Sequence, residues 1–125
     1  METNKLRVLV VDDNDFIRTT LFEFLLHKGF EVGLAEDGQM GLEMFEKIRF
    51  DFVLTDCGMP QMDGLELAKE IKKKQPAAVV IMMSGDLNQK RRARDVVNFF
   101  LEKPFKFEDA YNLMISEGES ETLSV

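Results

Sequence analysis

Five short apolar runs alternate with five segments of helical periodicity, and this alternation restricts the possible folds more than any other feature of the chain. The apolar runs are apolar along most of their length, which predicts strands that are buried on both faces. The expected strands are residues 6–11, 31–35, 51–55, 78–83 and 99–101. The expected helices are residues 16–25, 38–48, 65–74, 88–97 and 107–116. Regular alternation of strand and helix favours parallel strands joined by right-handed crossovers.

The chain has 125 residues, which is the length of one ordinary domain with a single core. Five strand–helix units are too few to close an eight-stranded barrel. We therefore predict an open, doubly wound α/β domain of three layers with helices on both faces of a five-stranded parallel sheet. The domain is expected to span residues 1–117, and the glutamate-rich residues 118–125 are expected to form an acidic tail or the start of a linker.

Charge and composition exclude several classes of function. The net charge of −7 and the pI near 4.8 argue against direct binding of nucleic acid or anionic lipid. No apolar stretch is long enough for a membrane helix, and the start METNKLRVLV does not resemble a secretory signal, so a cytoplasmic protein is expected. The single cysteine, Cys57, has no partner for an intramolecular disulfide and is expected to be a small, partly buried side chain.

Polar side chains follow four of the five predicted strands. Asp12 and Asp13 follow the first, Asp56 the third, Ser84 the fourth and Lys103 the fifth. The carboxyl ends of parallel strands lie at one edge of the sheet, so these side chains are expected to form one site. Three neighbouring carboxylates repel one another, and a divalent cation with a preference for oxygen ligands, Mg²⁺ or Mn²⁺ as a substitute, would relieve this repulsion. Such a site is suited to phosphoryl transfer.

Four segments carry a resemblance to a known family. In their order and spacing, VLVVDDNDFIR, LTDCGMPQMDG, VIMMSGD and FFLEKPF resemble the receiver domain of two-component response regulators, of which the single-domain chemotaxis type is the best known. The resemblance covers residues 5–117. It implies a flavodoxin-like fold with strand order 2-1-3-4-5, which is a standard example of the doubly wound class.

The resemblance implies a role for each acidic residue. Asp56 matches the phosphoacceptor, which takes a phosphoryl group from a phosphohistidine of a histidine kinase or histidine phosphotransfer protein. Asp13 and Asp56 would bind Mg²⁺ directly, Gly58 would bind it through its backbone carbonyl, and Asp12 would bind it mainly through water. Such a module would catalyse its own phosphorylation and dephosphorylation without being a turnover enzyme.

The resemblance also implies a switch. Lys103 would pair with the phosphoryl oxygens, and the Lys103–Pro104 peptide bond would be cis. Ser84 matches a hydroxyl that moves to the phosphoryl group, and Phe100 matches an aromatic ring that rotates inward behind it. Since Phe100 has no hydroxyl to satisfy, a bias toward the inward position is expected. The switched surface would comprise residues 88–116, where a downstream protein would bind and where phosphorylation could drive dimerisation.

Two departures from the family pattern leave alternatives open. An aspartyl-phosphate hydrolase would need a second aspartate two residues after the nucleophile, and Gly58 stands there, which counts against that class. A receiver that docks constitutively would be expected to lack an acid or the lysine, and none is missing. The segment from Ser84 to Lys103 is about one turn shorter than usual, so the helix at 88–97 could be short or shifted. The basic run from Lys90 to Arg94 is a solvated helix face or a docking site for an acidic partner.

Overall fold

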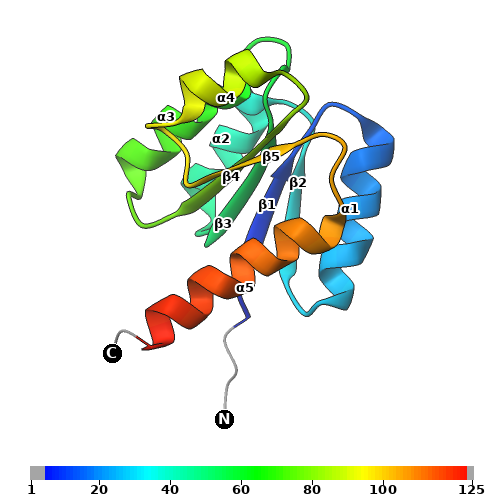
Figure 1. The fold of residues 1–125 in the computed structure, drawn as a ribbon, viewed down its shortest axis with the longest axis vertical. Helices are drawn as coiled ribbons and strands as arrows, with labels where there is room; N and C mark the ends of the chain where they lie inside the picture. The colour runs from blue at the N-terminus through cyan, green and yellow to red at the C-terminus, as the bar shows by residue number, and fades with distance from the viewer. Residues whose placement is uncertain (1–4, 124–125) are drawn as a thin grey trace.

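The computed structural model describes the backbone of residues 5–123 and the side chains of residues 5–117. The five strands form one parallel sheet in the order β2-β1-β3-β4-β5, which confirms the predicted fold (Figure 1). The strands are β1 (Arg7–Val11), β2 (Glu31–Ala35), β3 (Phe52–Asp56), β4 (Val79–Ser84) and β5 (Phe99–Glu102). Strand order reverses between β1 and β3, so the carboxyl ends of these two strands mark the place where a site is expected.

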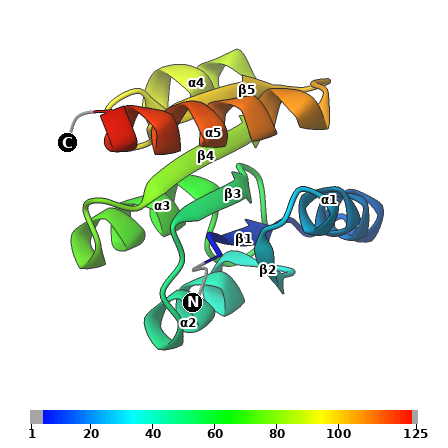
Figure 2. The same cartoon turned by 90° about the horizontal axis from the view of Figure 1, so that it is seen from below.

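Helices cover both faces of the sheet (Figure 2). Helices α1 and α5 pack on one face, and α2, α3 and α4 pack on the other. The helices are α1 (Asp15–His27), α2 (Gly38–Lys47), α3 (Gly64–Lys74), α4 (Leu87–Ala93) and α5 (Phe107–Leu123). No helix in residues 5–123 is both long and apolar enough to cross a membrane.

The central strand β1 shows why an uninterrupted apolar run forms the middle of this fold. Val8 and Val10 pack into the core beneath α1 and α5, whereas Leu9 and Val11 pack into the core beneath α2 and α3. All four side chains are completely buried. Burying each of them stabilises the fold by about 1.5–3 kcal/mol. A polar residue at any of these positions would be buried on one face or the other, because alternate residues of a strand point to opposite faces.

Polar caps fix the start of four helices. The side chains of Asn14, Asp37, Asp63 and Asp86 each accept a hydrogen bond from a backbone N–H in the first turn of the helix that follows. A cap of this kind is worth about 1 kcal/mol. Three of the capped helices, α1, α3 and α4, begin directly after the loops at the carboxyl ends of β1, β3 and β4. The caps therefore determine how the chain leaves the edge of the sheet where the site lies.

Helix α4 ends at Ala93, four residues before the predicted end at residue 97. The backbone N–H groups of Val96 and Val97 both donate to the carbonyl of Ala93, which closes the last turn. Asn98 then pairs with Val80 of β4: its N–H donates to the Val80 carbonyl, and its side-chain Oδ1 accepts from the Val80 N–H. Competition from this pairing draws the chain out of the helix and into β5. The expectation of a short fourth helix is confirmed.

Helix α5 extends beyond its predicted end at residue 116 and reaches Leu123. The helical part of the predicted acidic tail, residues 118–123, contains one glycine and no proline, so nothing in it blocks helix propagation. The expectation of a non-helical segment after residue 116 is therefore wrong for the backbone up to Leu123. The side chains from residue 118 onward lie outside the described residues, and the domain boundary at residue 117 stays a prediction.

Candidate functional site

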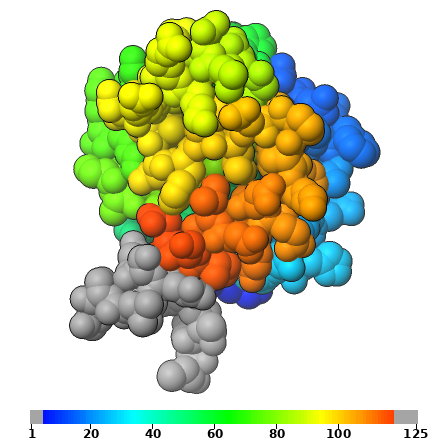
Figure 3. All heavy atoms as spheres, viewed as in Figure 1, coloured from blue at the N-terminus to red at the C-terminus, as the bar shows by residue number. Residues whose placement is uncertain are grey.

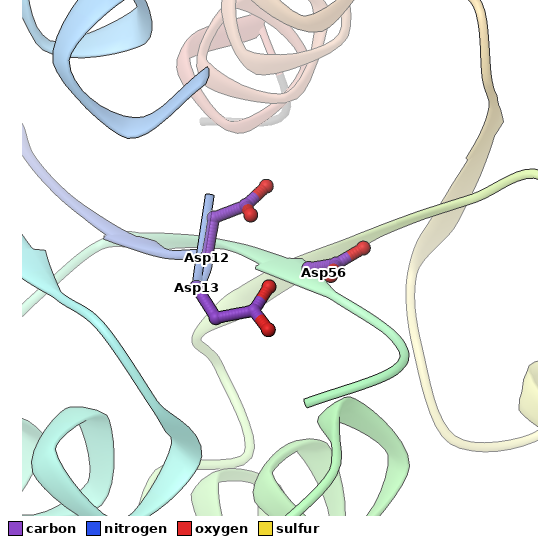
Figure 4. Close-up of side chains that lie close together, drawn as sticks. All are labelled: Asp12, Asp13 and Asp56. Carbon is purple, nitrogen blue, oxygen red and sulfur yellow. The ribbon is translucent and has the colours of Figure 1, made fainter. Parts of the chain in front are cut away.

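Three carboxylates meet at the carboxyl ends of β1 and β3, as the sequence predicts. Asp12 and Asp13 follow β1 directly, and Asp56 is the last residue of β3. The register aligns Val11 with Thr55, which places the residues that follow them at the same level of the sheet. Each aspartate offers a carboxylate oxygen, and these three oxygens lie within 4.8 Å of one another (Figure 4). The fold therefore concentrates negative charge at one point of its edge.

Asp12 is the most buried of the three acids, with 1% of its surface exposed. Its Oδ1 accepts a hydrogen bond from the backbone N–H of Asn14 at 2.9 Å, and its Oδ2 is buried without a hydrogen-bond partner among the described residues. Burial raises the pKa of the Asp12 carboxyl, and the charges of Asp56 and Asp13 add to that rise, while the Asn14 hydrogen bond and Lys103 oppose it. A buried carboxylate oxygen with no partner is costly, which points to a cation as its missing partner.

Lys103 supplies the positive charge at this site. It follows β5, and its Nζ lies 2.9 Å from Oδ1 of Asp56. Partial burial lowers the pKa of the ammonium, but the hydrogen bond from Asp56 and the charges of the aspartates outweigh this effect, so the pKa of Lys103 is raised. Lys103 therefore carries its proton at neutral pH. One ammonium does not balance three carboxylates, and the site keeps a formal charge of −2 when all four groups are ionised.

The donor set fits a small divalent cation. Mg²⁺ prefers hard oxygen ligands and is usually bound by one or two carboxylates together with water. The cluster offers carboxylate oxygens from Asp12, Asp13 and Asp56, of which Asp13 is exposed to solvent. The unpartnered Oδ2 of Asp12 and the excess negative charge are the two observations that match such an ion.

Ser84 and Phe100 lie on the neighbouring strands. Ser84 ends β4 next to Glu102 of β5, and its carbonyl accepts a hydrogen bond from the Lys103 N–H at 2.9 Å. Its hydroxyl oxygen accepts from the Asp86 N–H at 3.0 Å, within its own loop. Phe100 is half-buried and packs against the small cluster formed by Cys57, Leu65, Met82 and Ala93.

The remaining predicted positions flank Asp56 and Lys103. Gly58 is exposed, and a Cβ atom placed on it would have open space around it. The Lys103–Pro104 peptide bond is cis.

Arg18 stabilises the site, and sequence reasoning missed it. Its Nη1 donates to the backbone carbonyl of Asp12 at 2.7 Å, and its Nη2 forms an ion pair with Asp15. The guanidinium therefore ties the loop after β1 to the first turn of α1. The pair Asp15–Arg18 has the three-residue spacing of a helix-surface ion pair, which is the only sequence signal for it.

Gly64 is a second missed residue, and it shapes the loop after Asp56. Its N–H donates to the Cys57 carbonyl at 2.8 Å, which closes the loop between β3 and α3. A Cβ atom at this position would lie 2.3 Å from the carbonyl oxygen of Asp56. Only glycine allows α3 to begin so close to the backbone of Asp56. The sequence signal was present in the breaker-rich stretch before α3, although it gave no reason to single out this glycine.

Comparison with known proteins identifies the family. The family model described as the response regulator receiver domain matches residues 8–114. The transcriptional regulatory protein PdtaR of Mycobacterium tuberculosis is 38% identical, and the match covers 94% of this chain and 64% of that protein. The chain thus spans less than two thirds of that relative. Chemotaxis protein CheY of Listeria monocytogenes is 37% identical over 81% of this chain and 88% of its own length.

A solved structure gives the same result. The response regulator protein TrrA of Thermotoga maritima, determined in complex with Mg²⁺ and BeF, matches with a TM-score of 0.83 and 32% identity over 89% of this chain and 97% of that chain. Receiver domains are phosphoacceptor modules rather than turnover enzymes, and in general they interact with histidine kinases and downstream effectors. The chain belongs to the response regulator receiver domain family of two-component signalling proteins.

Proposed function

We propose that Asp56 accepts a phosphoryl group from a phosphohistidine of a histidine kinase or histidine phosphotransfer protein. A carboxylate oxygen of Asp56 attacks phosphorus, the P–N bond breaks, and its electron pair stays on the imidazole of the donor. The product is an acyl phosphate on Asp56. The observation that carries this proposal is the position of Asp56, which lies between the Lys103 ammonium and the two other carboxylates.

The residues around Asp56 divide the work. Lys103 holds one oxygen of the Asp56 carboxylate, which leaves the other oxygen for the attack, and its charge favours the incoming phosphoryl oxygens. Asp12, Asp13 and Asp56, together with the backbone carbonyl of Gly58, would hold Mg²⁺, with Mn²⁺ as a substitute. The bound ion would neutralise charge on the transferring phosphoryl group. Asp13 is the exposed direct ligand, and the buried Asp12 acts mainly through water.

Phosphorylation would then change a surface of the protein. The phosphoryl group adds about 1.5 to 2 negative charges and three acceptor oxygens at Asp56. We infer that the Ser84 hydroxyl leaves its hydrogen bond with Asp86 to donate to these oxygens and that Phe100 rotates into the space behind it. Ser84 and Phe100 lie on adjacent strands that both border α4, which supports this coupling.

The surface formed by α4, β5 and α5 would carry the signal to a downstream protein. It could also support a phosphorylation-dependent dimer. The same site residues would catalyse both phosphorylation and dephosphorylation of the chain.

A phosphorylation assay tests the proposal. The protein is incubated with Mg²⁺ and acetyl phosphate, and intact mass spectrometry is expected to show one added phosphoryl group. The group should be absent when EDTA replaces Mg²⁺ and in Asp56→Asn. The variant Asp95→Asn, which removes an exposed carboxylate outside the acidic cluster, should be phosphorylated like the wild type. Undiminished phosphorylation of Asp56→Asn would show that another residue is the acceptor.

A further inference from the structure

A groove runs between α4 and β5 and continues toward α3. Its first part has a volume of about 350 Å³ and is lined by the cations Lys90, Arg91 and Arg94 and by the apolar side chains of Leu87, Phe99 and Phe100. The second part, of about 560 Å³, shares Arg94 with the first. We refer to the two parts together as the α4 groove. Figure 3 shows α4, β5 and α5 together on the face that carries its first part.

The second part of the α4 groove adds more positive charge. Its lining includes three lysines of α3, namely Lys69, Lys72 and Lys73, against one acidic residue, Asp95. The ammonium of Lys72 is bound to two backbone carbonyls at the end of α3, and Lys73 pairs with Glu70. Lys69 forms no ion pair with a described residue. The groove is therefore a basic band on a chain whose net charge is −7.

The arginines of the α4 groove lack internal partners. Among the described residues, no carboxylate lies within 4.0 Å of the guanidinium of Arg91 or Arg94, and Lys90 pairs with Glu102 at 3.5 Å. A guanidinium offers a planar fork of donors that matches a carboxylate in two hydrogen bonds. Both arginines are exposed and free to form such pairs with another molecule.

The apolar part of the groove favours a peptide over a polyanion. Leu87 is 62% exposed, which is high for a large apolar side chain, and the rings of Phe99 and Phe100 are half-buried beside it. A nucleic acid backbone would satisfy the cations but would meet the negative field of the rest of the chain. An amphipathic helix satisfies both halves of the lining, because its apolar and charged residues lie on different faces.

We propose that the α4 groove binds an acidic, amphipathic segment of a partner protein. Apolar side chains of that segment would pack on Leu87 and the two phenylalanines, and its carboxylates would pair with Arg91 and Arg94. This inference deepens the proposed function and rests on it, since it specifies the chemistry of the downstream partner at the surface that Asp56 would control. Phe100 belongs both to the groove lining and to the proposed switch, which couples the two.

A selection experiment tests this inference. A displayed library of random 16-residue peptides is selected on the full chain in the presence of Mg²⁺ and acetyl phosphate. Enriched peptides are expected to carry net negative charge and apolar residues at helical spacing. The best peptide is labelled, and its affinity is measured by fluorescence anisotropy. Charge reversal in Arg91→Glu/Arg94→Glu is expected to weaken binding at least tenfold.

A matched double variant controls for net charge. Lys47→Glu/Arg92→Glu changes the total charge by the same amount, and neither Lys47 nor Arg92 lines the α4 groove. This control should bind the peptide within twofold of wild type. Equal loss of affinity in both double variants, or enrichment of neutral or basic peptides, would overturn the inference. Tighter binding of a 20-nucleotide single-stranded RNA than of the selected peptide would also overturn it.

Phosphorylation, followed by intact mass in the same samples, separates the two proposals. If the chain is phosphorylated and no acidic peptide binds, the docking inference fails and the proposed function stands. If an acidic peptide binds the groove and the chain is never phosphorylated, the proposed function fails, while the chemistry of the groove is still as inferred. Loss of folding in the charge-reversal variant is checked by circular dichroism. A neutral Arg91→Gln/Arg94→Gln variant, expected to lose at least threefold in affinity, replaces it if needed.

Discussion

Replacing Asp12 with asparagine should have opposite effects in the absence and in the presence of Mg²⁺. Asn keeps the shape of the side chain and the oxygen that accepts from the Asn14 N–H at 2.9 Å. It removes the charge of a group that is 1% exposed and whose carboxylate oxygen lies within 4.8 Å of oxygens of Asp13 and Asp56. The metal-free protein should become more stable, and the stabilisation by Mg²⁺ should shrink.

The magnitude follows from the geometry. Two unit charges at the 4.8 Å limit of the cluster repel by about 3.5 kcal/mol at an effective dielectric constant of about 20. The lost attraction between Asp12 and Lys103 offsets part of this gain, and Asp13 is exposed enough for water to screen its share. We expect Asp12→Asn to raise the free energy of unfolding in EDTA by about 1 to 2 kcal/mol.

The sign also fixes the pH dependence. Because burial raises the pKa of Asp12, its charge destabilises the folded state above the folded-state pKa, and this penalty disappears as the pH falls toward the unfolded-state value. The advantage of Asp12→Asn should therefore be full at pH 7 and should shrink at acidic pH.

Urea unfolding at pH 7, in EDTA and in excess MgCl₂, measures both effects. Mg²⁺ at about 100 times its dissociation constant should stabilise the wild type by about 2.7 kcal/mol and should stabilise the variant by much less. Asp95→Asn is the control and should behave like the wild type in both solutions. A metal-free Asp12→Asn protein that is less stable than wild type, or that keeps the full response to Mg²⁺, would refute the reasoning.

Three further predictions concern single groups at the site. Gly64→Ala should lower the free energy of unfolding by about 2 to 3 kcal/mol, because the new Cβ would lie 2.3 Å from the Asp56 carbonyl oxygen, whereas Gly58→Ala, which meets no atom within 4 Å, should change it by less than about 0.5 kcal/mol; equal urea midpoints for the two variants would contradict this. The raised pKa of Lys103 means that its ammonium stabilises the fold fully below its unfolded-state pKa and stops doing so as the pH rises through the folded-state value, so Lys103→Met should flatten the loss of stability that urea titrations detect above pH 10. Burial raises the pKa of Cys57 to about 11, so its alkylation by iodoacetamide at pH 8 should be slow in the folded protein and fast in urea, and fast alkylation of the native chain would show that the thiol is accessible.

The architecture could be predicted from the sequence because its main signals are local. An apolar run such as Val8 to Val11 has to be buried on both faces, and the carboxylates that follow β1 and β3 reach one edge of the sheet by topology alone. The same reasoning failed at α4 and α5, where the ends depend on long-range pairing or on the absence of a stop signal. Asn98 ends the region of α4 through its pairing with Val80, which no local pattern reveals.

The positions of individual side chains were less predictable than the site itself. Arg18 reaches a backbone carbonyl that lies six residues earlier, and Gly64 is required because of the neighbouring Asp56 backbone. Both contacts exist only after the loops have folded. Cys57 was expected to be partly buried and is 3% exposed, because it packs with Leu65 and Met82 beneath α4. The roles of Ser84 and Phe100 as a switch concern a change between two states and stay predictions.

The measurement that tests the central claim most directly is the location of the phosphoryl group. After incubation with Mg²⁺ and acetyl phosphate, sodium borohydride reduces an aspartyl phosphate to homoserine, and peptide mapping by mass spectrometry identifies the converted residue. We predict homoserine at position 56 alone, with unmodified aspartate at positions 12 and 13. Homoserine at position 12 or 13, or no conversion at position 56 in a sample whose intact mass shows a phosphoryl group, would contradict the assignment of Asp56 as the acceptor.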